Sequence, residues 1–453
     1  MHVGVHLNLL KACGRSNKFY SAWGLNVIII QALENNLMKN YPGEQSSPRP
    51  RIDMTCQSAR QPTVAAIEFM TFHHEVLVAF CKHTIELKID TLVIAPSTGI
   101  QKAISRYAAN SFEQLKELAF NNKTRFSLSV SHSPRDTAEG IMEADAIFIG
   151  TLPPPPSKKL QTNNSHSRHE EMITAVKEVL KLNKPIYIVI HKPQVDAAQL
   201  IACLEPSECA KISIIYLSRE TAEFCKRQYP NHFRSELVMP AIGLHNSPKK
   251  HKAFKSPTSI NMIVAGEISS KRRQYESLAY LSVHRKWLRS ERVVIQVIGR
   301  IKLESWREKV LRLCALPAAW LFIVKYPSLL TLWLYGCLDL SMARYSKVSD
   351  KDLADAITDS TCLLDLKRKH YSDDGQTTGA LGLAMTHAKP LINLEEITAI
   401  ASISQPSSAQ LNLHQLVEKE ADNLLVEKEA LVAQFRKQLQ KELISAISDQ
   451  FRT

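Results

Sequence analysis

The feature that most constrains this fold is a series of short apolar segments, several of which end at Pro, Gly or His. Residues with helical periodicity separate these segments along much of the chain. Segments that are apolar on both faces are typical of parallel strands covered by helices on both sides. The sequence therefore predicts an α/β fold with parallel sheets. The predicted strands include 91–95, 125–130, 146–150, 186–190, 212–217, 260–265, 292–298, 361–366 and 390–394.

The length of 453 residues predicts two domains, because a single core stops growing at roughly 250–300 residues. A basic segment that contains prolines and few large apolar residues suggests where they divide. After the second set of strands the sequence becomes a long helical tail. This tail either packs back across the lobes or binds a partner helix. The predicted parts are a first lobe at 1–243, a linker at 244–258, a second lobe at 259–405 and a C-terminal helix at 406–453.

The charge balance favours anionic partners. The chain has 57 basic and 44 acidic side chains, which leaves a net charge of +13. Phosphate groups, anionic lipid head groups and nucleic acid would all suit it. There is no aromatic RNP-like strand, helix-turn-helix or zinc module, so we expect no specific nucleic-acid binding. The nine cysteines are scattered without a C-x-x-C motif, and residues 1–12 do not read as a signal peptide. Together these features predict a cytoplasmic protein.

The most apolar region is 308–341, which Arg312 and Lys325 interrupt. A helix that spans a bilayer needs about 20 predominantly apolar residues, and the uncharged runs here are shorter. We therefore expect that the region does not cross a membrane. It forms either buried core or a monotopic patch that lies on a membrane surface.

The first motif with chemical meaning is INMIVAGEISSKRRQ, residues 260–274. A buried strand ends at Gly266, and Lys271 and Arg272 stand where we predict a helix over 271–288 to begin. Free N–H groups at a helix N-terminus, together with two cations, favour a diphosphate. The alternative is an ordinary strand-to-helix turn followed by a solvated basic run.

The second motif is HYSDDGQTTGALGLAMTHAKPLI, residues 370–392. After a turn at 373–375, Thr377, Thr378 and Gly379 open a predicted helix at 378–387 that continues with Ala380. Threonine at the N-cap with glycine beside it lets a phosphate approach the backbone closely. The alternative is that the small residues serve close packing between helix and sheet.

The order and spacing of these motifs resemble the second lobe of the retaining glycosyltransferases with two Rossmann lobes (GT-B fold). This family includes sucrose synthases and bacterial lipopolysaccharide sugar transferases. The matching stretches also include VIQVIGR, which ends its strand at Gly299, and VSDKDLADAITDSTCLLDL at 348–366. The resemblance implies two Rossmann-like lobes and places the phosphate-binding elements in the second.

The first lobe resembles the family more weakly. Its opening, MHVGVHLNLL…GLNVIIIQAL, resembles the family's first strand, acceptor loop and helix, with the helix beginning just after Gly24. The resemblance implies that Gly24 binds substrate, as do Gly266 and Gly299 in the second lobe. KPIYIVIHKP resembles the strand whose terminal histidine faces the cleft, and this implies that His191 positions the donor sugar or the acceptor hydroxyl. A single histidine at the end of a strand also has a purely structural interpretation.

Two departures from the family concern the glutamates around its Gly-rich helix. Their places are taken here by Gly375 and Leu383. Asp373 and Asp374 are the nearest acids to the first place, and we assign Asp374 to that role. The arginine that commonly follows the phosphate-loop glycine is Glu267 in this chain.

The resemblance implies a glycosyltransferase of polysaccharide biosynthesis that transfers a hexose from a nucleotide-diphosphate-sugar to a glycan or lipid-linked saccharide. Its chemistry would need neither a metal nor another cofactor, because cations and backbone N–H groups can stabilise the departing diphosphate. A lipid-linked acceptor would place the protein in the cytoplasm, in peripheral contact with the inner face of a membrane. The alternative is a catalytically inactive relative that binds nucleotide-sugars or acts as a scaffold.

Overall fold

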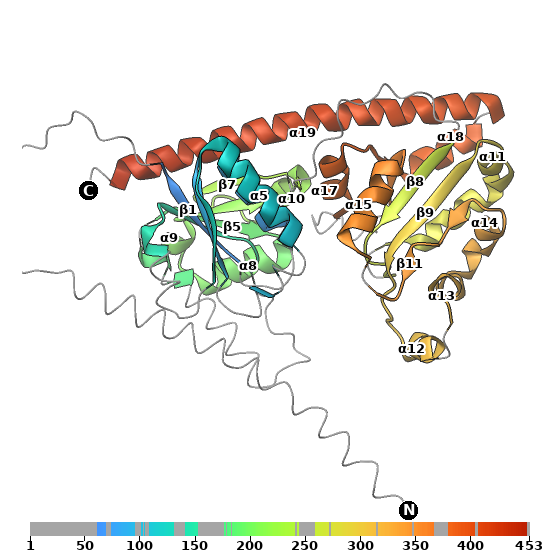
Figure 1. The fold of residues 1–453 in the computed structure, drawn as a ribbon, viewed down its shortest axis with the longest axis horizontal. Coiled ribbons are helices and arrows are strands. Elements are labelled where there is room, and N and C mark those ends of the chain that lie inside the picture. Colours follow the sequence, from blue (N-terminus) through green and yellow to red (C-terminus); the bar gives the residue numbers. More distant parts are fainter. Residues whose placement is uncertain are drawn as a thin grey trace, which may run out of the picture. The chain divides into compact units, whose positions relative to one another are not determined.

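The computed structural model divides the chain into two compact units (Figure 1). The first lies within Met1–Tyr216, Cys225–Leu237 and Arg436–Thr453, and the second within Leu217–Phe224 and Val238–Phe435. The structure describes residues 61–68, 74–95, 101–102, 104, 108–130, 141–152, 176–177, 179–182, 184–240, 242–243, 259–270, 273–313, 316–346, 348–366, 379–403 and 406–450. Outside these ranges lie the predicted linker 244–258 and the predicted site residues Gly24, Lys271, Arg272, Asp374, Thr377 and Thr378.

The first unit is built on a seven-stranded sheet in the order β3-β2-β1-β4-β5-β6-β7. Neighbouring strands from β1 to β6 pair in parallel. The strands are β1 (Thr63–Ile67), β2 (Asp90–Ala95), β3 (Phe126–Val130), β4 (Ala146–Ile149), β5 (Ile186–Ile190), β6 (Ile212–Tyr216) and β7 (Ser235–Val238). The helices include α3 (His74–Glu86), α5 (Ala109–Asn122), α8 (Pro193–Cys203), α9 (Pro206–Cys209) and α10 (Arg219–Gln228).

Every residue of β4, β5 and β6 is buried, as expected for central strands with helices on both faces. Phe80 of α3 stacks on Phe148 of β4 with ring centroids 3.7 Å apart, which anchors that helix to the middle of the sheet. The strands predicted from 91–95, 125–130, 146–150, 186–190 and 212–217 are confirmed within a residue or two.

The second unit contains a smaller parallel sheet in the order β10-β9-β8-β12-β13, and β11 also pairs with β9. The strands are β8 (Ile260–Ala265), β9 (Val293–Arg300), β10 (Leu338–Asp339), β11 (Ala343–Arg344), β12 (Cys362–Asp365) and β13 (Leu391–Asn393). The helices include η3 (Tyr275–His284), α11 (Arg285–Ser290), α12 (Trp306–Leu313), α13 (Ala318–Lys325), η4 (Pro327–Leu329), α14 (Leu330–Leu334), α15 (Asp350–Asp359), α17 (Gly379–His387) and α18 (Leu394–Ile403).

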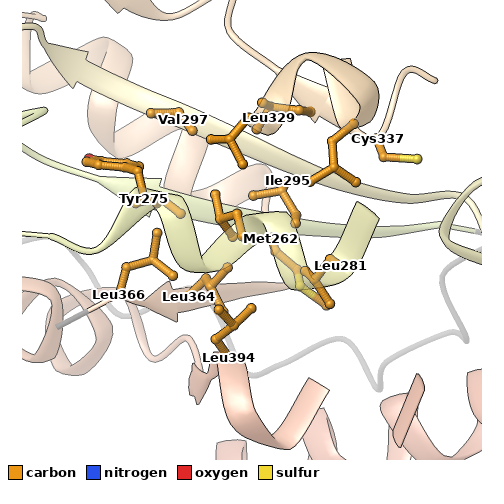
Figure 2. Close-up of a cluster of buried hydrophobic side chains, with 14 of the residues drawn as sticks. Met262, Tyr275, Leu281, Ile295, Val297, Leu329, Cys337, Leu364, Leu366 and Leu394 are labelled. Carbon is orange, nitrogen blue, oxygen red and sulfur yellow. The ribbon is translucent and has the colours of Figure 1, made fainter. Parts of the chain in front are cut away.

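The main core of this unit lies on one face of the sheet (Figure 2), and it explains why one predicted helix is wrong. The sequence predicts a continuous α-helix over 271–288, whereas the structure has the 3₁₀ helix η3 followed by the short α11. The buried residues of η3 are Tyr275, Leu278 and Leu281, which are spaced by three. A 3₁₀ helix has three residues per turn, so this spacing brings all three onto the core face.

A lysine before a proline has the same structural role in both units. Lys184, which leads into β5, donates through Nζ to the carbonyl oxygens of Met142 and Ala144, both at 2.5 Å, just before β4. Lys389, which leads into β13, donates to the carbonyls of Thr358 and Ser360, at 2.7 and 2.5 Å, just before β12. Each ammonium thus donates hydrogen bonds to backbone carbonyls that have no intrahelical partner at the end of a helix.

The predicted C-terminal helix is confirmed as α19 (Pro406–Gln450). Its buried residues recur at spacings of four or seven, as an amphipathic helix requires. Leu413 and Val417 join the core cluster of the second unit. In the first unit, Gln438 Nε2 donates to the Glu236 carbonyl at 3.2 Å, and Glu442 accepts a hydrogen bond from Ser213 at 3.1 Å.

The apolar region 308–341 forms several short helices. Its middle is buried core, since Leu321, Phe322, Leu329 and Leu332 are fully or almost fully covered. Over the ranges given above, no helix is both long and apolar enough to cross a bilayer.

Candidate functional site

In the second unit, the carboxyl ends of β8 and β12 mark the point where the order of strands reverses. The chain proceeds outward from β8 through β9 to β10, and then returns to β12 on the other side of β8. Ligands of open α/β sheets bind in the crevice at such a switch point. The predicted residues Gly266 and Gly299 both lie at this edge, at the ends of β8 and β9.

Gly266 and Gly299 are in direct backbone contact. A Cβ at Gly299 would lie 1.7 Å from the carbonyl oxygen of Gly266, and Gly299 has φ of +151°. Gly266 also has positive φ, at +115°, and a Cβ there would come within 2.9 Å of Arg273 Nη2. The two glycines therefore let the strand ends approach and leave space for the guanidinium of Arg273 above the turn. That either glycine also touches a substrate stays a prediction.

Cations gather around this turn. Arg300, the last residue of β9, and Lys302, just beyond it, lie 3.4 and 3.5 Å from the carboxylate of Glu267. About half of each cation's side chain is exposed, so both are accessible from solvent. Arg273 adds a third cation next to Gly266, at the carboxyl end of β8. Glu267 is thus paired with two cations from the end of the neighbouring strand.

A network around Glu304 holds the loop that follows β8. Ser269 donates to Glu304 at 2.5 Å, Ser270 also donates to this carboxylate, and Lys325 Nζ lies 2.9 Å from it. Burial alone would raise the pKa of Glu304. The hydrogen bonds from the two serines and from Lys325 outweigh burial and lower that pKa to about 2. The charged carboxylate of Glu304, in the segment before α12, therefore holds the loop that carries Ser269 and Ser270 in place.

Replacement of Glu304 by Gln should weaken the acid dependence of the second unit's stability. The pKa of Glu304 is lowered on folding, so the unfolded chain binds this proton more tightly. Its contribution is complete above pH about 4.5 and disappears as the pH falls through about 2. At neutral pH, Glu304→Gln should cost up to about 3 kcal/mol. Urea unfolding followed by tryptophan fluorescence at several pH values measures this. Ser269→Ala should change stability in the same direction by a smaller amount. If the stability of Glu304→Gln falls with decreasing pH as steeply as that of the wild type, the lowered pKa of Glu304 is contradicted.

Helix α17 begins at Gly379, as predicted, and its first residue is open. Gly379 is exposed, and a Cβ there would meet no heavy atom of the described chain within 4 Å. The packing alternative for Gly379 is therefore not supported. Ala380 is buried, so only its backbone could face a ligand. Leu383 packs against the apolar cluster formed by Ile263, Leu363 and their neighbours.

A hollow of about 1220 Å³ opens at the same edge of the second sheet. Gln274, the neighbour of Arg273, lines it, as does Leu381 of α17. Asp365 and Asn393, the last residues of β12 and β13, contribute polar side chains, and further carboxylates come from α18 and α19. The loop after β8 and helix α17, which the sequence predicts to bind phosphate, thus each contribute one residue to a hollow that is large enough for a nucleotide-sugar.

The first unit has its own switch point, between β1 and β4. Glu68 follows β1 and is completely buried. Its Oε2 accepts a hydrogen bond from Thr151 Oγ1 at 3.3 Å, and a Cβ at Gly150 would come within 2.5 Å of the same oxygen. A carboxylate thus lies against the backbone at the position where an α/β sheet binds its ligand.

His191 lies at the end of β5 and contacts Gly150, the residue that lies against Glu68. Its Nε2 is 3.0 Å from the carbonyl oxygen of Gly150. A carbonyl only accepts, so Nε2 donates, and in the neutral ring Nδ1 is the acceptor nitrogen. Asp196 fixes the backbone here by accepting from the N–H groups of His191 and Lys192, at 2.9 and 2.8 Å. Contact of His191 with a sugar stays a prediction.

Two residues were missed by the sequence argument, although each carries a signal. Arg273 is the third member of the Lys-Arg-Arg run, of which the sequence argument uses only Lys271 and Arg272. Glu68 directly follows the apolar strand TVAAI, a short segment like the others that were recognised. Within the described ranges, no group of three or more His, Cys, Asp or Glu side chains could hold a metal ion.

No protein-family model and no curated protein matches the sequence. Solved structures resemble the chain remotely. A glycosyltransferase from Rickettsia africae is 9% identical, with a TM-score of 0.42, over 86% of this chain and 99% of its own. HepE from Anabaena, solved with UDP and glucose, is 11% identical, with a TM-score of 0.44, over 84% and 99%. A UDP-forming trehalose-phosphate synthase from Burkholderia vietnamiensis is 9% identical, with a TM-score of 0.39, over 85% and 99%. At such distances, function has to be argued from this chain's own residues.

Proposed function

We propose that the chain is a GT-B-type glycosyltransferase that moves a sugar from a nucleotide-diphosphate-sugar to a glycan or lipid-linked saccharide. The observation that carries the proposal is the carboxyl edge of the second sheet. There the Gly266–Gly299 contact, the guanidinium of Arg273 and the open start of α17 lie at the ends of neighbouring strands and helices. A hollow opens at the same edge, lined by Gln274 beside Arg273 and by Leu381 of α17.

The chemistry of this edge suits a departing diphosphate. Cleavage of the bond between sugar and diphosphate builds negative charge on the phosphate oxygens. Arg273, Arg300 and Lys302 supply positive charge beside them, and the N–H groups at the start of α17 supply hydrogen-bond donors. Charge stabilisation of this kind does not require a metal.

The polar side chains of the hollow suit hydroxyl groups. Asp365, Asn393 and Glu395 line it together with acids of α19. Carboxylates accept hydrogen bonds from hydroxyls, so these side chains could bind the ribose or the donor sugar in place of the glutamate that Leu383 replaces. In the first unit, Glu68 and His191 are the candidates for contact with the acceptor. A lipid-linked acceptor would bring the enzyme to the inner face of a membrane.

A second candidate function is binding of a nucleotide-sugar without catalysis. The observation in its favour is Leu383, which packs against apolar neighbours where the family has a glutamate. Such a relative would bind nucleotide at the same edge and leave the donor intact.

A screen of donor hydrolysis distinguishes these functions. The purified chain is incubated with individual nucleotide-sugars, and release of the nucleoside diphosphate is followed by mass spectrometry. Slow hydrolysis of one donor is the expected result, because hydrolysis needs no acceptor. Calorimetric binding without hydrolysis would support the non-catalytic function, and neither binding nor hydrolysis of any donor would contradict both.

Replacement of Arg273 by Ala should weaken binding of the donor's nucleoside diphosphate by about 1.5–3 kcal/mol, the range for a hydrogen bond to a charged group. Titration calorimetry with the diphosphate released in the screen measures this. Arg289→Ala is the matched control, since Arg289 is an exposed cation of the same unit in α11, which leads into the opposite end of β9. Equal affinities in the two variants would remove Arg273 from the site.

A further inference from the structure

Helix α12 is anchored to the second unit by one side only. Glu308 accepts from the backbone N–H of Ser305 at 3.1 Å and pairs with Lys325 at 3.1 Å. Leu311, one turn further on, packs against the core cluster. Beyond the end of the helix, the Tyr345 hydroxyl donates a hydrogen bond to the carbonyl oxygen of Leu316 at 2.5 Å. The guanidinium of Arg312 lies over the Tyr345 ring. The side that carries Glu308 and Leu311 is therefore the one that faces the protein.

The opposite side of α12 is apolar and exposed. Trp306, Val310 and Leu313 follow one another at spacings of four and three, so they share one face of the helix. Their side chains are 70%, 45% and 84% exposed, and α12 has no fully buried residue. Figure 1 shows α12 at the margin of its unit. A surface helix normally turns its apolar face to the core, and this one turns it outward.

Exposed cations flank this apolar face. Arg307, Lys309 and Arg312 are exposed, whereas the charge of Glu308 is balanced by its ion pair with Lys325. The outward charge of α12 is therefore entirely positive. On α13, which contacts α12, Trp320 and Val324 are about half exposed and add a second apolar pair.

We propose that α12 binds the surface of an anionic lipid bilayer. An apolar face with aromatic and aliphatic residues, bordered by Lys and Arg, is how a helix lies in the plane of a membrane interface. Trp306, Val310 and Leu313 enter the boundary between head groups and acyl chains. Arg307 and Lys309, which border the apolar face, meet the lipid phosphates, because each is positive and exposed. Arg312 lies over Tyr345, nearer the side that faces the protein. A second copy of this face would bring like charges together, whereas an anionic bilayer presents the opposite charge.

The position of α12 also bears on the acceptor. The helix follows β9 after a short segment, so it belongs to the same carboxyl edge as Gly299 and Arg273. A bilayer bound by α12 would present a lipid-linked acceptor at that edge. This step rests on the proposed function, whereas binding of the membrane by α12 does not.

The test is flotation of the full chain with vesicles, without any nucleotide-sugar. One vesicle preparation is phosphatidylcholine alone, and the other is an equimolar mixture of phosphatidylcholine and phosphatidylserine. We expect binding to the mixed vesicles. The double variant Trp306→Ser/Leu313→Ser should bind at least about tenfold more weakly, since two side chains lose their apolar burial. The double variant Arg307→Gln/Lys309→Gln should bind about 25-fold more weakly, at about fivefold for each cation.

Matched controls remove similar side chains elsewhere. Phe120→Ser deletes an aromatic side chain that is 83% exposed on α5, and Lys437→Gln/Lys441→Gln deletes two exposed cations of α19. Both should float as wild type does. All variants change surface positions, and circular dichroism checks that each remains folded.

Three outcomes would overturn the proposal. The first is that the wild-type protein does not bind the mixed vesicles. The second is that the α12 variants and their controls lose vesicle binding equally. The third is a stable dimer in light scattering that Trp306→Ser/Leu313→Ser dissociates, without vesicle binding, because α12 would then be an interface between copies. Donor hydrolysis measured without lipid is independent of these results, so failure of membrane binding and failure of the proposed function are separate observations.

Discussion

Replacement of Gly299 by Ala should destabilise the second unit by more than about 4 kcal/mol. A Cβ at this position would lie 1.7 Å from the carbonyl oxygen of Gly266, and this neighbour is backbone at the end of the adjacent strand. No side-chain rotation can relieve the overlap, so β8 and β9 must separate where they border the core. Losses of this size are rare for single substitutions and need a specific cause of this kind. Urea unfolding followed by tryptophan fluorescence measures the effect, because Trp287, Trp306, Trp320 and Trp333 all belong to the second unit.

Gly336→Ala is the matched control for backbone strain. Gly336 has φ of +72°, yet a Cβ there would meet no atom of the described chain within 4 Å. This variant should lose only about 1–2 kcal/mol, the cost of a left-handed conformation for an L-residue. The difference between the two variants isolates the contact with Gly266. Similar losses in both would mean that the strand ends can move apart freely.

The central strands were predictable because each is a short apolar segment that is buried on both faces. IYIVI and INMIVA give β5 and β8 at the expected residues. The type of helix was harder to predict, since Tyr275, Leu278 and Leu281 fit a 3₁₀ helix through contacts with core residues that are distant in sequence. The exposure of the apolar face of α12 was also not predictable, because the sequence alone does not tell whether an apolar residue faces the core or solvent.

The candidate site was predictable at its glycines and less so at its charged residues. Gly266 and Gly299 stand at the ends of recognisable strands, and the switch point places them together. Arg273 and Glu304 depend on how the loop after β8 folds back, which no local pattern specifies. Glu68 requires knowledge of the strand order, because only the return from β3 to β4 makes the end of β1 a binding edge.

Replacement of Gly379 by Val should abolish binding of the donor's nucleoside diphosphate and leave stability nearly unchanged. Gly379 is exposed at the start of α17, and the described chain leaves the space around its Cβ position open. In the proposed function this space holds the donor phosphates, which approach the first backbone N–H groups of the helix. A valine side chain would occupy it. Valine has a helix propensity no worse than that of glycine, so the helix itself should persist. Calorimetric titration and urea unfolding of the same variant measure the two quantities.

Ala384→Val is the contrasting variant on the same helix. Ala384 is completely buried in the cluster with Ile263 and Leu363, so the added methyl groups should overpack it by about 1–3 kcal/mol. Its folded fraction should still bind the nucleoside diphosphate, because the side chain points into the core and away from the open end of α17. The two variants should therefore show opposite patterns, with affinity lost in one and stability lost in the other. If Gly379→Val instead lowers stability and keeps wild-type affinity, the start of α17 serves packing. The phosphates would then have to bind through the cations at the ends of β8 and β9 alone.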